Sequence, residues 1–457
     1  MSGFMLVAPI HQAEAQSAQL LYEEAESIGL SSSNEADLQR ALELYQRAAE
    51  QGKNAALYRL GVLHAKFGNF PEAIAAYEES VFRGSSSGQI ALAEGHARGT
   101  FGTLSNTSLG VPELERIVAE QQNDRAAYLL AQLLETGTGT ARNTARSTAI
   151  YSELAENGYA PALRQIGRLH LRGNHVTNTP KDLRKALDFL ERGIAAGSSS
   201  AKRDYGLALI QVGRKQEAFE VLSDAANSGV PGAEAELANG HYRGWFGALS
   251  EEKTGRTLLN NLVENGDLYA IRYALIHHER RSRRLTELDL PEVLNSLEQQ
   301  SDLGSEFAAR MLAGAYRNLR SHISDDRAKL AKLVEDHAVE LGSEALAAET
   351  ITVLYDKNDY YGSRLASAEY LEGLDTVGLA KGALRLRSIE PRAYVFVLQR
   401  QLKARGMYSG SVNGLATRST LRAILRFCKQ EGYFDVCTHG PISHASATRI
   451  MQSLEDA

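Results

Sequence analysis

Apolar residues recur at helical spacing in paired segments along most of the chain. The segment Leu38–His64 holds leucine, alanine and tyrosine three and four residues apart on either side of Gly52. Spacing of this kind predicts two amphipathic helices joined by a glycine turn. The same plan returns at Ser147–Gly173, Ala186–Leu209, Ala218–Gly244 and Val293–Tyr316. We therefore expect an all-α chain built from repeated helix pairs.

A glycine marks the turn of nearly every predicted pair: Gly52, Gly84, Gly158, Gly197, Gly229, Gly266, Gly304 and Gly342. Successive turns lie 32 to 39 residues apart, except for one interval of 74 residues that we interpret as two units. Asn123 stands where the missing glycine would be, and asparagine is the expected substitute at a left-handed helix end. Small residues nine positions after several turns, such as Gly61 and Gly167, predict close approach of two helices.

The repeated pattern is that of a known family. A-x-x-x-L-G-x-x-Y-x-x-G, followed by K-A-x-x-x-Y-x-x-A-A-x-x-G, resembles Sel1-like repeats, which are close relatives of tetratricopeptide repeats. The resemblance covers roughly residues 35–385 in about nine units. It implies an α-solenoid of antiparallel helix pairs with a concave face that binds partner proteins.

Five of the 12 histidines fall at one position of the repeat: His64, His96, His170, His241 and His278. Two of them belong to near-identical segments, GHARGTFG from Gly95 and GHYRGWFG from Gly240. Leucine or tyrosine fills the position in other units, which an obligatory set of metal ligands would not allow. We expect a structural joint in which the ring packs and a nitrogen bonds a helix-terminal carbonyl. A pH-responsive histidine ladder is the alternative.

The repeat pattern stops near Ser388. The following sequence predicts an amphipathic helix that ends at Gly406, a glycine-rich loop and a second amphipathic helix. Its L-Q-x-x-L opening and G-x-Y-x-G-x-x-[DN]-G loop resemble the small three-helix peptidoglycan-binding domain of cell-wall hydrolases and envelope proteins. The resemblance implies glycan-binding candidates at Gln399, Tyr408, Gly410, Asn413, Gly414 and Thr420. A module that has lost its ligand and only caps the solenoid is the alternative.

The two ends of the chain suggest export. Residues 4–10 form a short apolar run before a small-x-small site, so we interpret residues 1–16 as the remnant of a secretory signal with a truncated start. Chance resemblance is the alternative. The only cysteines, Cys428 and Cys437, are expected to form a disulfide in an exported protein. The alternative is a zinc site formed by these two cysteines with His439 and His444.

Composition and motifs argue against most other functions. The net charge of -6 argues against general nucleic-acid binding. The basic run from Arg280 to Arg284 is predicted to be a solvated surface patch. The chain has no HExxH, Walker, GxGxxG or CxxC motif. GSSSG at Gly84–Gly88 fits a nucleophile pattern, but it falls at a predicted helix turn where no strand could present the serine. We therefore expect no enzymatic activity and no cofactor.

These observations predict a periplasmic, non-enzymatic scaffold of three parts: residues 1–16, a solenoid over residues 17–388, and a peptidoglycan-binding-like domain over residues 389–457. The solenoid would bind envelope proteins and the last part peptidoglycan, with a role in exopolysaccharide export or envelope organisation. The alternatives are a periplasmic regulator of a membrane sensor and an accessory subunit of a cell-wall enzyme.

Overall fold

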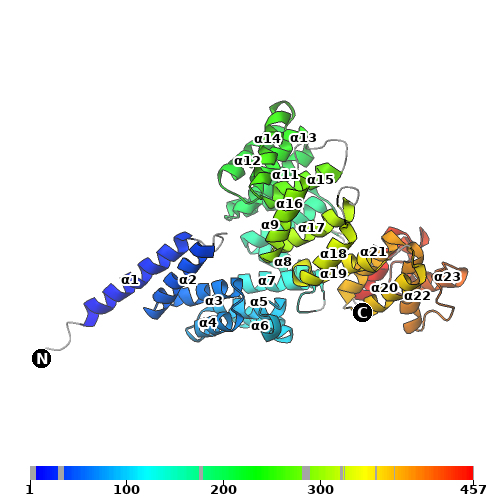
Figure 1. Ribbon diagram of the computed structural model, residues 1–457, viewed down its shortest axis with the longest axis horizontal. Helices are drawn as coiled ribbons and strands as arrows, with labels where there is room; N and C mark the ends of the chain where they lie inside the picture. Colours follow the sequence, from blue (N-terminus) through cyan, green and yellow to red (C-terminus); the bar gives the residue numbers. More distant parts are fainter. Residues whose placement is uncertain are drawn as a thin grey trace. The chain divides into compact units, whose positions relative to one another are not determined.

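The computed structural model describes residues 7–28, 35–140, 142–173, 179–279, 289–319, 323, 325–355, 358–374 and 376–455. These residues form 25 α-helices, two short 3-10 helices and no β-strand. The predicted all-α class is therefore confirmed (Figure 1). The basic run from Arg280 to Arg284 and the first six residues of the predicted signal remnant lie outside the described residues.

The helices form two compact units, one up to Tyr159 and one from Ala160. The first unit contains α1 (Val7–Ile28), α2 (Glu35–Glu50), α3 (Asn54–Lys66), α4 (Phe70–Phe82), α5 (Ser86–Arg98), η1 (Gly102–Leu104), α6 (Thr107–Gln121), α7 (Asp124–Thr136) and α8 (Thr144–Glu156). The predicted boundary between residues 16 and 17 falls inside α1. Over the described residues of both units, no helix is long and apolar enough to cross a membrane.

The second unit continues the repeats and then changes character. Its repeat helices are α9 (Ala160–Arg172), α10 (Leu183–Ala195), α11 (Ser199–Val212), α12 (Lys215–Asn227), α13 (Ala233–Arg243), η2 (Gly247–Leu249), α14 (Glu252–Glu264), α15 (Leu268–Glu279), α16 (Leu290–Asp302) and α17 (Glu306–Asn318). Its remaining helices are α18 (Asp326–Asp336), α19 (Ala338–Leu354), α20 (Tyr360–Glu372), α21 (Thr376–Ile389), α22 (Pro391–Ala404), α23 (Arg418–Gln430), α24 (Phe434–Thr438) and α25 (His444–Glu455).

Each predicted turn glycine has a positive φ, from 68° at Gly229 to 92° at Gly197. An L side chain is disfavoured in this conformation, which is why glycine recurs there. The odd-numbered helices α3 to α17 follow these turns, and we call them the A helices. The even-numbered helices α4 to α16 are the B helices. In the pairs from α3 to α14 the A helix packs on the next B helix, as α3 does on α4 and α11 on α12, so the predicted solenoid of helix pairs is confirmed.

The predicted close approach of the helices is visible at the small residues of the A helices. A Cβ atom added to Gly61 would lie 2.4 Å from Cε1 of Tyr77 on α4. One added to Gly206 would lie 2.6 Å from Cγ of Leu222 on α12. Because non-bonded carbon atoms rest about 3.5–4 Å apart, the large B-helix side chain occupies the space that a larger A-helix residue would need.

The missing turn glycine is replaced differently from our expectation. Gln122, with φ 49°, is the left-handed residue that ends α6, whereas Asn123 has φ -86°. The Asn123 side chain instead accepts a hydrogen bond from the backbone N–H of Ala126 and caps the start of α7. An N-cap requires an extended backbone, so one asparagine cannot serve both helix ends at this turn.

The segment after the repeats shares a core with the last repeat helices. One hydrophobic cluster runs from Ile351 on α19 through Leu386 on α21 to Met451 on α25, and α21 packs against both α22 and α25. Ser388 lies in the last turn of α21, so the structure continues through the predicted boundary. The predicted three helices correspond to α22, α23 and α25, with the five-residue α24 between the last two.

Candidate partner-binding surface

The five histidines of the shared repeat position lie in the last turns of A helices: His64 in α3, His96 in α5, His170 in α9, His241 in α13 and His278 in α15. Each is thus held by a separate helix. The contacts that they make divide them into groups.

His96 and His241 form the same joint in different units. The Nδ1 atom of His96 accepts a hydrogen bond of 3.1 Å from the backbone N–H of Asn106, and that of His241 accepts one of 3.2 Å from Glu251. Asn106 and Glu251 directly precede the next B helices, α6 and α14. We expected a bond to a helix-terminal carbonyl. The structure shows the opposite direction of hydrogen bonding: each ring accepts a hydrogen bond from a backbone N–H at the start of the next helix.

The residues around these two histidines complete the joint. The ring of His96 meets that of Phe101 edge-on with centroids 5.3 Å apart, and His241 meets Phe246 in the same way at 5.4 Å. A Cβ atom on Gly95 would lie 2.1 Å from Cζ of Phe101. The repeated glycine therefore makes room for the phenylalanine ring beneath the histidine, which explains why the whole segment recurs.

His170 belongs to a simpler arrangement. Its ring stacks on Phe189 with centroids 5.9 Å apart and an angle of 10° between the planes. Burial lowers the pKa of His170, as it does those of His96 and His241. These rings are therefore held neutral, and an unprotonated Nδ1 is what the joints at His96 and His241 require.

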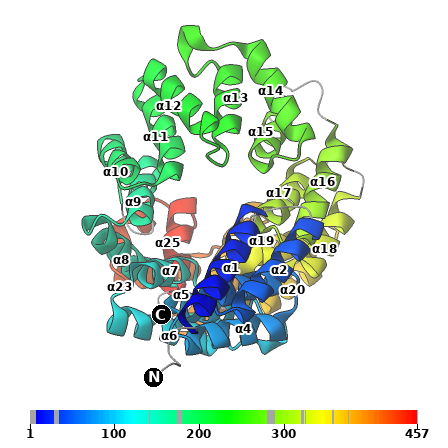
Figure 2. The ribbon, with the colours of Figure 1, turned by 90° about the vertical axis from the view of Figure 1, so that its left-hand side faces the viewer.

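A second repeat position carries arginine in the second unit. Six residues after a turn glycine lie Arg164, Arg203, Arg272 and Arg310, on α9, α11, α15 and α17. Alanine occupies the position in α13. We did not identify this pattern from the sequence, although the register that aligns the histidines would have shown it. Within the second unit, Figure 2 shows the A helices α9, α11, α13 and α15 following one another.

A buried carboxylate connects the first two of these helices. The Asp204 side chain on α11 is 3% exposed. Its Oδ2 atom lies 2.6 Å from Nε of Arg164 and 4.0 Å from Nε of Arg168, both on α9. Its Oδ1 atom lies 3.8 Å from Arg203. Three guanidinium groups thus surround one carboxylate, and only Arg164 is within hydrogen-bond distance of it.

The network continues to α13 and α15. Arg203 stacks over the ring of Tyr269, 4.9 Å from its centroid, and donates a hydrogen bond of 2.7 Å to the carbonyl of Pro231. Glu236 on α13, 3% exposed, accepts a hydrogen bond from the hydroxyl of Tyr273 and lies 3.9 Å from Arg272. These contacts therefore join α9, α11, α13 and α15 in one polar network that lines successive A helices.

We call Arg164, Arg168, Arg203 and Arg272 the arginine row. These four cations face two carboxylates, those of Asp204 and Glu236. Burial raises the pKa of Glu236, which weakens it further as a counter-charge. Burial also lowers the pKa of Arg168, and three neighbouring arginines act in the same direction. The surface therefore holds more positive charge than its own carboxylates balance.

The glycan-binding candidates meet around one loop, and most of them are buried. Gln399 and Thr420 are both 0% exposed. The Oε1 atom of Gln399 accepts hydrogen bonds from the backbone N–H groups of Asn413, at 2.9 Å, and Gly414, at 2.8 Å, while its Nε2 donates to Oγ1 of Thr420. Tyr408 donates to the carbonyl of Ser411 at 3.0 Å.

This geometry gives the motif a structural role. A Cβ atom on Gly410 would lie 2.5 Å from the hydroxyl of Tyr408, so the glycine is needed for that ring to reach its place. Of the six candidates, Asn413 is exposed, whereas Gln399 and Thr420 are out of reach of any ligand in solution. The motif residues therefore hold the loop, and only its exposed side chains are positioned to touch a glycan.

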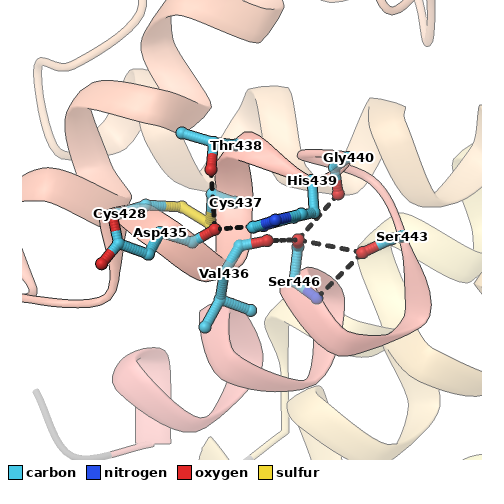
Figure 3. Close-up of a disulfide and its surroundings, with 9 residues drawn as sticks. All are labelled: Cys428, Asp435, Val436, Cys437, Thr438, His439, Gly440, Ser443 and Ser446. Atoms are coloured by element: carbon cyan, nitrogen blue, oxygen red, sulfur yellow. Dashed lines mark hydrogen bonds between the residues drawn. A yellow bond between two sulfur atoms is a disulfide. The ribbon is translucent and has the colours of Figure 1, made fainter.

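Cys428 and Cys437 form a disulfide that joins α23 to α24 (Figure 3). Beside it the carbonyl of Asp435 is 2.7 Å from Nδ1 of His439, and the Ser446 hydroxyl donates to the carbonyl of Gly440 at 2.7 Å. The bonded sulfur atoms are not thiolates, so the alternative zinc site loses two of its four ligands. The side chain of His444 lies outside the described residues.

The joint predicts that stability depends on pH. Since burial lowers the pKa values of His96 and His241, their contribution should be complete above about pH 6.5 and should be lost as the pH falls through the lowered values. Between pH 7.5 and 5.5 we expect Tm to fall by about 2–6 °C. The double variant His96→Asn/His241→Asn keeps an acceptor that does not titrate, and its Tm should change less. An equal fall in both proteins, measured by circular dichroism, would contradict the joint.

Comparison with known proteins identifies part of the repeat region. Residues 31–88 match the model of the tetratricopeptide repeat, and residues 124–159 and 160–198 match that of the Sel1 repeat. Chitin synthase regulatory factor 3 of Schizosaccharomyces pombe is 29% identical over 167 residues, which are 35% of this chain and 18% of that protein. The chain thus spans less than a fifth of the length of this relative.

Two solved structures are similar at low identity. One, a protective antigen of uropathogenic Escherichia coli strains with an SLR fold, is 17% identical with a TM-score of 0.37, and the comparison covers 97% of this chain and 96% of that one. The other, a Sel1 repeat protein of Oxalobacter formigenes, is 21% identical with a TM-score of 0.42 and covers 55% and 99%. The family models together show that this chain contains tetratricopeptide-like and Sel1-like repeats.

Proposed function

We propose that this protein is a non-enzymatic scaffold that binds partner proteins on the A-helix face of its second unit. The observation that carries the proposal is the polar network of α9, α11, α13 and α15, in which Arg164, Arg203 and Arg272 occupy one repeat position. Repeat proteins of this kind bind protein partners over extended surfaces. Side chains spread over successive helices suit that task better than chemistry at one point.

The fold around the serine-containing motif supports a non-enzymatic role. Ser86, the central residue of GSSSG, is the first residue of α5, and Ser85 before it caps that helix. A nucleophile elbow needs a strand that delivers the serine into a sharp turn. Here a B helix and a glycine turn precede it, so the hydroxyl is not presented for attack.

Photo-cross-linking in the cells that make the protein tests the scaffold. Benzoylphenylalanine placed at Arg172, an exposed residue of α9 beside Arg168, should give discrete adducts with partner proteins. The matched position is Glu220, exposed on the B helix α12, where we expect no adduct. Adducts of equal yield at both positions, or none at Arg172, would contradict a partner surface on the A helices.

We further propose that the protein works in the periplasm and that residues 389–457 attach it to peptidoglycan. The disulfide between Cys428 and Cys437 supports this location, because disulfides persist in oxidising compartments. The scaffold would then serve exopolysaccharide export or envelope organisation. Regulation of a membrane sensor is a second candidate role. An accessory subunit of a cell-wall enzyme would use the same surface.

Co-sedimentation of the full chain with purified peptidoglycan sacculi tests the attachment. The wild-type protein should be retained in the pellet. Gln399→Leu should release it, because the loop N–H groups of Asn413 and Gly414 lose their acceptor and the loop loses its shape. Gln401→Leu, on the same helix but half-buried, is the matched control and should sediment. A wild-type protein that stays in the supernatant would leave this segment as a cap of the solenoid.

A further inference from the structure

We propose that the arginine row binds an extended, acidic segment of the partner protein, with carboxylates of that segment supplying the missing negative charge. This inference rests on the proposed scaffold function and adds the chemistry of the partner.

The two internal carboxylates bond to only one arginine of the row. Asp204 is within hydrogen-bond distance of Arg164 alone, and Glu236 is bonded to Tyr273. Neither carboxylate is within hydrogen-bond distance of Arg168 or Arg272: Asp204 lies 4.0 Å from Arg168, and Glu236 lies 3.9 Å from Arg272. The row therefore has guanidinium groups that an external carboxylate could pair with.

Some hydrogen-bond donors of the arginine row are also without an acceptor among the described residues. In the described part of the chain, the Nε atoms of Arg168, Arg203 and Arg272 are buried without a hydrogen-bond acceptor. The side chains as a whole remain 31%, 14% and 41% exposed, so an approaching ligand can reach the groups. An anion that pairs with the exposed part of these guanidinium groups would balance charge that the two buried carboxylates leave unbalanced.

The spacing of the helices suits an extended peptide. Packed helices lie about 8–10 Å apart. A peptide in the extended polyproline II conformation has three residues per turn and rises about 3.1 Å per residue, so its residues three positions apart lie on one side and about 9 Å from each other. Acidic residues three positions apart in such a peptide therefore reach neighbouring A helices such as α9 and α11, and those six positions apart reach from α11 to α15.

The surroundings favour a peptide over a nucleic acid. The rings of Tyr269 and Tyr273 are already covered by Arg203 and Arg272, at 4.9 and 5.0 Å from their centroids, so they do not offer open faces for stacking bases. The carboxylates of Asp204 and Glu236 lie among the arginines and would repel a continuous line of phosphates.

The test measures binding of labelled peptides to the full-length protein by fluorescence anisotropy. The probe is a fluorescein-labelled peptide of four Glu-Ser-Ser repeats, and its control has Gln-Ser-Ser repeats. We expect the acidic peptide to bind at least about tenfold more tightly, with an affinity that falls as salt is raised. Equal affinity for the two peptides, or binding of neither, would overturn the proposal.

Two single-charge variants locate the site. Arg168→Gln should weaken binding of the acidic peptide by about tenfold, roughly the loss of one charge-assisted hydrogen bond, while the close pair of Arg164 and Asp204 keeps the fold intact. Arg184→Gln removes an exposed charge from the B helix α10 and should change affinity less than about twofold. Unfolding curves check that both variants are folded. An unchanged affinity in Arg168→Gln would overturn the proposal.

Two competitors separate the remaining outcomes. The first competitor is an oligothymidylate of twelve nucleotides. If it binds more tightly than the acidic peptide, the ligand of the arginine row is a nucleic acid, and the proposal is overturned. Excess acidic peptide should abolish the cross-linked adducts formed at Arg172. If the adducts persist, the scaffold function stands and the acidic partner is wrong, whereas a complete lack of adducts refutes the scaffold itself.

Discussion

In three of the helix pairs the A helix has no space for a side chain where it meets the B helix. At Gly167, as at Gly61 and Gly206, an added Cβ atom would lie within 2.6 Å of a large B-helix residue. Such a contact fixes both the rotation of the A helix and its position along the B helix. Residues three positions before and after it are therefore held in equivalent places in successive units, which is what allows one repeat position to have a constant role.

Two positions of the repeat, one on either side of this helix contact, have different roles. After the contact, His96 and His241 are held neutral and accept hydrogen bonds from the start of the next helix, so they connect one pair to the next. Before the contact, arginines of the second unit stand over buried carboxylates. At His96 and His241 the histidine position is satisfied within the chain. The arginine position is not, which is the physical basis for assigning partner binding to it.

Much of the fold could be predicted because turn chemistry is local. A positive φ favours glycine, so the turn glycines show the period directly. The turn at Asn123 was misplaced by one residue, since asparagine is suited to both ends of a helix. The sequence could not show that one core extends across the predicted boundary near Ser388, because a shared core depends on contacts between residues that are distant in the sequence. The arginine row was missed because single arginines are ordinary on a helix surface, and only their alignment makes them informative.

Hydrogen–deuterium exchange of the full-length protein, alone and with a cross-linked partner purified for the purpose, tests the central claim most directly. We expect the partner to slow exchange in α9, α11 and α15 and to leave the exchange rates of the B helices α10 and α12 unchanged, because only the A helices carry the arginine row. Protection confined to the B helices or to residues 389–457 would contradict it.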